Sequence, residues 1–261
     1  MKKFFLLLFG IAVFTACNNN SKKDTAQEIN MNADLLQQNL KGKVKSITET
    51  STNIDSTGVE KPDSLTTYTS FDEKGYQTEF LTKDSSGKVV SEQFAERNDS
   101  GLVTEFGTKK DGKIVSRVVT DISKDGKYLG GKRYDSTGKQ DGYYKDLMQN
   151  EYSIVYSGKL YDMNDKVKET FDMKYDKTHF LGGKTTDSTG KTAYEGTAKV
   201  NDKGDMTEED YTYVEDGKSK SEKKTYKYDN YDNKGNWTQR TTYDNKDKRT
   251  KVVKRSFMYY E

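Results

Sequence analysis

A turn motif of one form recurs along this chain and constrains its fold more than any other feature. Asp-Ser-Thr-Gly occurs three times, ending at Gly58, Gly138 and Gly190, and looser Asp/Asn-x-x-Gly copies lie between them. An Asp or Asn side chain can accept backbone N–H groups inside a tight turn, and a glycine three residues later can adopt the left-handed conformation that a Cβ opposes. The motif therefore predicts a series of β-hairpin turns.

The copies follow one another at strand-length intervals. Successive motif glycines from Gly75 to Gly138 are 11 to 14 residues apart. After the turn is subtracted, each interval leaves a strand of about 8–10 residues. The segments 129–139 and 181–191 are also identical at nine of eleven positions, with an offset of 52 residues. This longer period indicates that a block of about four strands was duplicated.

Composition and alternation agree with strands that have only one buried face. Hydrophobic residues make up 31% of the chain and charged residues 33%, so any core is thin. In the segment 65–71 the period of a strand places Leu65, Thr67, Thr69 and Phe71 on one face. Pro62 is the only proline, so backbone pairing is possible almost throughout.

We therefore predict an all-β fold, an antiparallel meander of about 12–14 strands built from hairpin repeats over residues 41–261. Three arrangements satisfy the pattern: a closed up-and-down barrel, an open twisted sheet, and two packed sheets. We favour an elongated curled sheet or two packed sheets, because open sheets seldom exceed about ten strands. A barrel embedded in a membrane is not expected, since no face carries a continuous apolar band.

The N-terminal residues predict export and lipidation. Lys2 and Lys3 precede an apolar run that ends in Thr-Ala-Cys17, as in a secretory signal peptide over residues 1–16. The residues around Cys17, the only cysteine, resemble a bacterial lipobox, in which the cysteine carries acyl chains such as palmitate. Asn18 at the next position implies the outer membrane by the same resemblance. The alternative is an ordinary signal peptide with an unrelated cysteine.

Residues 17–40 are predicted to hold the lipidated cysteine, a polar tether and a short helix. The tether is rich in Asn, Ser and Lys, and residues 27–40 are the only helix candidate. The remaining residues, 41–261, form the β-hairpin repeat domain.

Tyr-Asp steps accompany many of the turns. They occur at 134–135, 161–162, 175–176, 228–229, 231–232 and 243–244. With the following glycine they resemble the YD repeats of RHS-type proteins, and the segment 231–240 is the nearest match. The run 131–144 also resembles a MORN-type repeat. The resemblance covers residues 40–261 and implies a β-repeat scaffold without a reaction.

Residues suited to catalysis or metal binding are scarce. His179 is the only histidine, so a multi-His metal site is excluded. Carboxylate runs such as 208–210 are typical of a solvated surface rather than of a glycosidase pair, and residues 229–236 lack the ligand spacing of a calcium loop. With 44 basic against 42 acidic residues there is no electrostatic case for nucleic acid. We expect no enzyme, no metal and no cofactor.

One aromatic group is a candidate binding surface. Trp237, the only tryptophan, has Tyr226, Tyr228, Tyr231 and Tyr243 nearby in the sequence. On one sheet face these rings could bind a sugar or a peptide. The alternative is that they form the apolar half of a thin core, since buried rings dominate the packing of such a sheet.

Two functions follow as expectations. The first is an outer-membrane lipoprotein whose β repeats form a non-enzymatic scaffold, with an envelope protein or a glycan as partner. The alternative is a carrier or receptor that binds a lipid, glycan or peptide on the concave sheet face. A carrier needs a concave apolar pocket, whereas a scaffold needs a filled interior or none.

Overall fold

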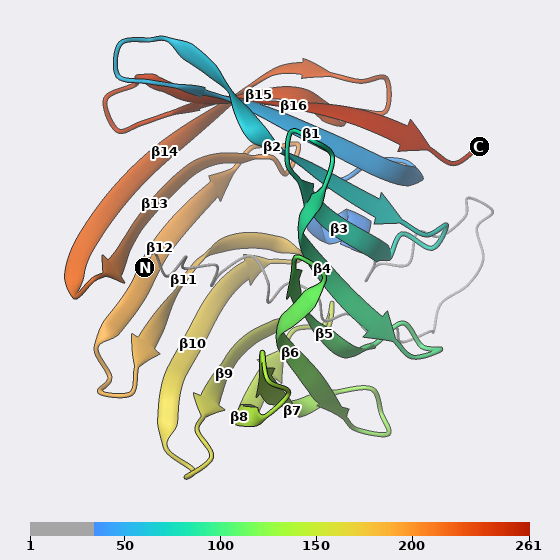
Figure 1. The fold of residues 1–261 in the computed structure, drawn as a ribbon, viewed down its shortest axis with the longest axis vertical. Helices are drawn as coiled ribbons and strands as arrows, with labels where there is room; N and C mark the ends of the chain where they lie inside the picture. Colours follow the sequence, from blue (N-terminus) through green and yellow to red (C-terminus); the bar gives the residue numbers. More distant parts are fainter. Residues whose placement is uncertain (1–33) are drawn as a thin grey trace.

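The chain forms one closed antiparallel sheet. In the computed structural model, which describes residues 34–261, sixteen strands are paired in sequence order and the sheet closes where β1 (Val44–Ile54) pairs with β16 (Arg249–Tyr259) (Figure 1). The predicted all-β antiparallel meander is confirmed. It differs from the arrangement that we favoured in two respects: it has sixteen strands over the described residues, and its two edges pair. Closure removes the unpaired edges that an open sheet would expose.

The other strands fill the sheet between these two. They are β2 (Glu60–Phe71), β3 (Gln77–Lys83), β4 (Val89–Arg97), β5 (Val103–Lys110), β6 (Lys113–Ile122), β7 (Tyr128–Asp135), β8 (Gln140–Gln149), β9 (Val155–Tyr161), β10 (Val167–Asp176), β11 (His179–Asp187), β12 (Thr192–Val200), β13 (Met206–Glu215), β14 (Lys218–Tyr231) and β15 (Trp237–Tyr243).

A single helix, α1 (Asp34–Gln37), precedes the sheet in the described part of the chain. It falls within the predicted helix 27–40, whose first residues lie outside the described range. The signal peptide, the tether and Cys17 also lie outside it, so export and lipidation stay predictions.

The Asp-x-x-Gly motifs form hairpin turns, as their chemistry predicts. At the β11–β12 turn, Asp187 Oδ1 accepts the backbone N–H groups of Thr189 (2.9 Å) and Lys191 (3.1 Å). Gly190 has φ +82° and donates its N–H to the carbonyl of Asp187 (3.0 Å). The hydroxyl of Thr189, followed by these amides, lowers the pKa of Asp187. The pairing register shifts beside the turn, as in a hairpin with a glycine bulge.

Degenerate copies of the motif keep the same backbone. Asp165 and Asp247 stand where other copies have glycine, and they adopt φ +61° and +56°. Asp tolerates the left-handed region better than most residues, so these turns form without glycine.

The duplicated block occupies equivalent strands. Its two Leu-Gly-Gly-Lys copies lie on β7 and β11, four strands apart, as the 52-residue offset predicts. Their glycines let neighbouring backbones approach closely. A Cβ on Gly130 would lie 2.5 Å from the carbonyl oxygen of Tyr144, and one on Gly182 would clash with the carbonyl oxygen of Gly196.

The core gathers at one end of the barrel. In a meander every second turn lies at the same end, and the turns that follow the even-numbered strands carry buried residues such as Tyr76, Leu102 and Ile154. The turn glycines at the other end, such as Gly138 and Gly190, are exposed. One buried cluster consists of Leu102, Tyr128, Val155, Phe171 and Met173, and a second of Leu35, Leu40, Val44, Ile47 and Phe71.

We expect two glycine substitutions to differ in their effect on stability, because only one of them forces a Cβ against a neighbouring backbone. Gly190→Ala meets open space and adds only the cost of a left-handed backbone, about 1 kcal/mol of unfolding free energy. Gly182→Ala is strained as well, at φ +123°, and also drives a Cβ into the backbone of β12, so its cost should be larger, about 3 kcal/mol. Urea denaturation followed by circular dichroism measures both. Equal losses would contradict the close approach of β11 and β12.

Candidate functional site

The segment 34–41, which we call the plug, lies across the end of the barrel where the core gathers. It makes hydrogen bonds to four turns at this end, those that follow β2, β10, β12 and β14. Its Leu35 and Leu40 are buried in the same cluster as Ile47 and Phe71 of the barrel wall. Because these turns belong to well-separated strands, the plug ties different sides of the barrel together.

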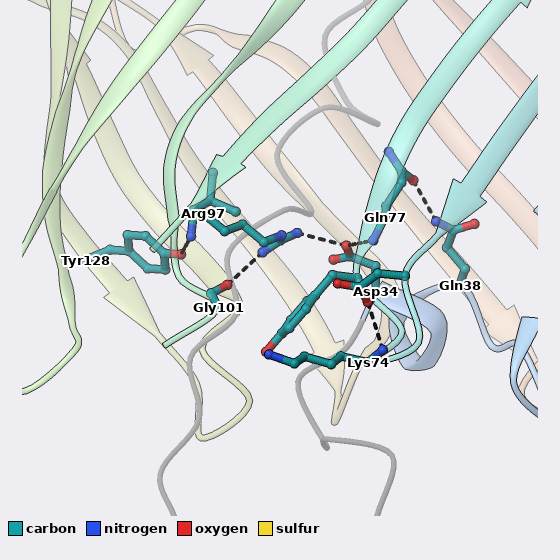
Figure 2. A network of polar contacts seen from close by, with 10 residues as sticks. Asp34, Gln38, Lys74, Gln77, Arg97, Gly101 and Tyr128 are labelled. Carbon is teal, nitrogen blue, oxygen red and sulfur yellow. Dashed lines mark hydrogen bonds and ion pairs between the residues drawn. The ribbon is translucent and has the colours of Figure 1, made fainter. Parts of the chain in front are cut away.

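A buried ion pair fixes the plug (Figure 2). Asp34 Oδ2 accepts the backbone N–H of Gln77 (2.5 Å) and a hydrogen bond from Nη2 of Arg97 (2.8 Å). Arg97 Nη1 also donates to the carbonyl of Gly101 (2.9 Å). The side chains of Arg97 and Asp34 are only 12% and 6% exposed. Burial raises the pKa of Asp34, and the charge of Arg97 opposes that shift.

An apolar pocket lies in the inner wall of β5 to β10. A barrel of sixteen strands is wider than side chains from its own wall can fill. The pocket has a volume of about 40 Å³, which admits one apolar group of a ligand rather than a whole ligand. Its lining residues are Phe106, Val118, Gly130, Gly131, Tyr144, Leu147, Val155 and Phe171.

The wall formed by β13 and β14 is polar and aromatic instead. Glu222 accepts hydrogen bonds from the hydroxyls of Tyr211 (2.8 Å) and Tyr213 (2.9 Å) and forms an ion pair with Lys224 (2.9 Å). Burial favours the neutral acid, but the bonds from Lys224 and the two tyrosines prevail and lower the pKa of Glu222 to about 2. This carboxylate is therefore charged and already paired.

The structure brings together most of the aromatic residues singled out in the sequence. Tyr228 contacts both Trp237 and Tyr231, with ring centroids 5.6 Å and 6.3 Å apart. Tyr226 joins them through Arg240, whose guanidinium lies over the rings of Tyr226 (4.8 Å) and Trp237 (5.1 Å). These rings line the interior, so they form one cluster.

Tyr243 does not join this cluster. It pairs in register with Thr225, the residue next to Tyr226, and therefore points to the opposite face of the sheet. There Lys227 lies over its ring, 4.7 Å from the centroid. The prediction that Tyr243 belongs with the other aromatic residues was wrong. It rested on closeness in sequence, whereas the alternation of side chains along a strand places Tyr243 on the opposite face.

Sequence reasoning missed the two arginines of this wall, Arg240 and Arg255, and the pocket residues on β5 to β10. Arg255 forms an ion pair with Glu49 of β1 (2.9 Å), and its guanidinium lies 3.7 Å from the ring centroid of Trp237. Nothing local distinguishes these two among 44 basic residues. Arg255 meets Glu49 only because closure brings β1 beside β16, whereas Arg240 lies over one ring of its own strand and one of the adjacent strand β14.

The carboxylates of residues 208–210 and His179, which the sequence offered as candidates for catalysis or metal binding, do not form a common site. Glu208 pairs with Lys199 (2.9 Å) and Lys223 (3.4 Å), whereas Glu209 points to the other face and accepts a hydrogen bond from Tyr226. His179 Nε2 is buried beside Gly204 and has no hydrogen-bond partner.

Within residues 34–261 no group of three or more His, Cys, Asp or Glu side chains could hold a metal ion. None of the helices found there is long and apolar enough to cross a membrane.

Comparisons with known proteins show a similar fold. The sequence matches no family model, and no curated protein matches it. The fold is similar to that of a porin-like protein from Bacteroides uniformis, with TM-score 0.54 and 12% identity over 82% of this chain and 96% of that one. More distant similarities include a LolA superfamily protein from Nitrosomonas europaea (TM-score 0.34, 15% identity, 92% and 94% coverage) and a DUF1329 family protein from Desulfovibrio piger (TM-score 0.31, 13% identity, 88% and 90% coverage).

The buried ion pair of the plug generates a pH-dependent prediction. Arg97→Met leaves Asp34 buried without its cation, which should lower the free energy of unfolding by about 3 kcal/mol at neutral pH. Without Arg97 the pKa of Asp34 rises further, and a carboxyl with a raised folded-state pKa costs stability that grows as the pH rises from its unfolded pKa to its folded pKa. The deficit should therefore shrink as the pH falls from about 8 towards 5.

Urea titrations of the wild type and the variant across this range provide the measurement. Lys88→Met is the matched control, because it breaks the pair with Asp111, in which the two side chains are 63% and 64% exposed, and should leave stability almost unchanged. A deficit that stays constant with pH would contradict a buried Asp34 whose pKa depends on Arg97.

Proposed function

We propose that this protein is a carrier or receptor that binds a small apolar or amphiphilic ligand inside its barrel. The observation that carries the proposal is the concave apolar pocket on the inner wall of β5 to β10. A scaffold that acts only through its outer surface needs no such pocket. The proposal thus favours the second of the two functions expected from the sequence.

The distribution of side chains supports this function. On the inner wall, Phe106 and Phe171 border the pocket and the neighbouring cluster adds Met173 and Phe180. Burying about 100 Å² of apolar ligand surface there would contribute about 2.5 kcal/mol.

The outer face carries cross-strand ion pairs. Examples are Lys109 with Glu92 (2.6 Å) and Arg117 with Glu105 (3.1 Å). A charged outside together with an inner wall that is apolar over β5 to β10 suits an apolar ligand carried through water.

The location that we propose is the bacterial cell envelope. The predicted signal peptide and the predicted acylation of Cys17 support export and anchoring at the outer membrane. The porin-like fold agrees with such a location. No reaction is part of the proposal: the barrel holds its ligand unchanged, and an envelope protein or glycan as partner remains a proposal.

Filling the pocket should weaken ligand binding. Val118 is buried at the pocket and Val119, the next residue of β6, points to the outer face opposite Lys132. We expect Val118→Trp to weaken binding of the uncharged fluorophore N-phenyl-1-naphthylamine at least tenfold, at a cost of about 1–3 kcal/mol in stability. Val119→Trp adds the same ring on the other face and should bind like the wild type.

Fluorescence titration of protein freed from co-purified ligand gives the affinities, and thermal unfolding checks that both variants are folded. Mass spectrometry of the untreated wild type should detect a co-purified apolar molecule. A wild type that binds no fluorophore, or equal binding by the two variants, would contradict a ligand site in the barrel.

A further inference from the structure

Two arginines of the inner wall converge on one tryptophan. The guanidinium of Arg255 lies 3.7 Å and that of Arg240 5.1 Å from the ring centroid of Trp237. Arg240 also lies over Tyr226, at 4.8 Å. Such cation–π contacts hold the planar guanidinium in place while its edge donors remain available for hydrogen bonds.

The strand register places these groups inside the barrel. Arg240 is paired with Tyr228 of β14 on one side and with Val253 of β16 on the other, and paired residues share a face. Arg255, two residues after Val253, is paired with Glu49 of β1. On the same face of β1, two residues earlier, Ile47 belongs to the cluster that includes the plug.

Only one of the two arginines has a carboxylate partner. Arg255 forms an ion pair with Glu49 (2.9 Å), whereas Arg240 forms none with any acidic side chain of residues 34–261. Burial and the nearby charge of Arg240 lower the pKa of Arg255, although Glu49 opposes this shift. The two positive charges therefore lie on the same inner wall, and the carboxylate of Glu49 is paired with only one of them, Arg255.

Two further carboxylates of the inner wall, Glu222 and Glu209, form no ion pair with Arg240, and Glu222 is already paired with Lys224 (2.9 Å). Glu209 accepts a hydrogen bond from the hydroxyl of Tyr226, at the far end of the ring over which Arg240 lies. The Nε of Arg240 is buried without an acceptor. The aromatic rings thus hold the guanidinium of Arg240 in place, but no carboxylate among residues 34–261 is paired with it.

We propose that Arg240 binds the carboxylate of an amphiphilic ligand whose tail extends towards the apolar wall. This inference rests on the proposed carrier function and names its ligand class, a long-chain carboxylate. A guanidinium offers two parallel N–H donors that match a carboxylate. Sixteen strands spaced about 4.8 Å apart close a barrel roughly 25–30 Å across, so a long chain is needed to reach from β15 towards β7.

The test compares two probes with the same tail, dodecanoate and dodecanol. Trp237 reports on the site directly, because it is the only tryptophan of the chain and touches both arginines. Wild-type protein should bind dodecanoate at least tenfold more tightly than dodecanol, as a charge-assisted hydrogen bond implies. Arg240→Gln should remove this preference and leave the affinity for dodecanol unchanged.

A matched control exists on the outer face. Arg117 also lies over a tyrosine, Tyr134 (4.6 Å), but it is paired with Glu105 and faces away from the interior. Arg117→Gln should keep the full preference for dodecanoate. Arg240→Lys retains the charge and should keep part of it.

The outcomes separate this inference from the proposed function. Equal wild-type affinities for the two probes, or a preference that survives in Arg240→Gln, overturn the carboxylate site while the carrier function stands. Failure of the wild type to bind either probe overturns both. If Arg240→Gln does not fold, the wild-type preference and its partial retention in Arg240→Lys still decide the matter.

Discussion

The pairing of β1 with β16 is the interaction on which the rest of this structure depends. It runs from Val44 opposite Tyr259 to Asn53 opposite Lys251, and it turns a meander of hairpins into a barrel with an inside and an outside. A closed sheet needs apolar residues on one face only, which explains how a chain with 31% hydrophobic residues forms an ordered core. Closure also brings Glu49 of the first strand to Arg255 of the last.

Within the closed sheet, the interior is divided between two kinds of surface. The plug and its buried ion pair with Arg97 occupy one end, where the two buried clusters lie. One side wall is apolar and lined in part by glycines, and the opposite wall carries tyrosines, carboxylates and arginines. An interior of this composition suits a ligand with one apolar and one charged part, and this asymmetry underlies both of our functional proposals.

The local features of this fold could be predicted from the sequence, because they depend on neighbouring residues. The acceptor at Asp187 and the left-handed Gly190 determine one turn by themselves, and the same chemistry recurs along the chain. Closure could not be predicted, since hairpin motifs say nothing of what the first and last strands do. The contact between Asp34 and Arg97 joins residues far apart in sequence, and only the register shows that Tyr243 faces away from Tyr226.

The central claim is that a ligand lies inside the closed barrel, between the arginines of β15 and β16 and the apolar wall. A crystal structure of the protein soaked with a long-chain carboxylate tests this most directly. Our account predicts β1 paired with β16, density for the carboxylate at Arg240, and density for the tail running towards Val118. Density for the ligand on the outer face, or an open edge between β1 and β16, would contradict it.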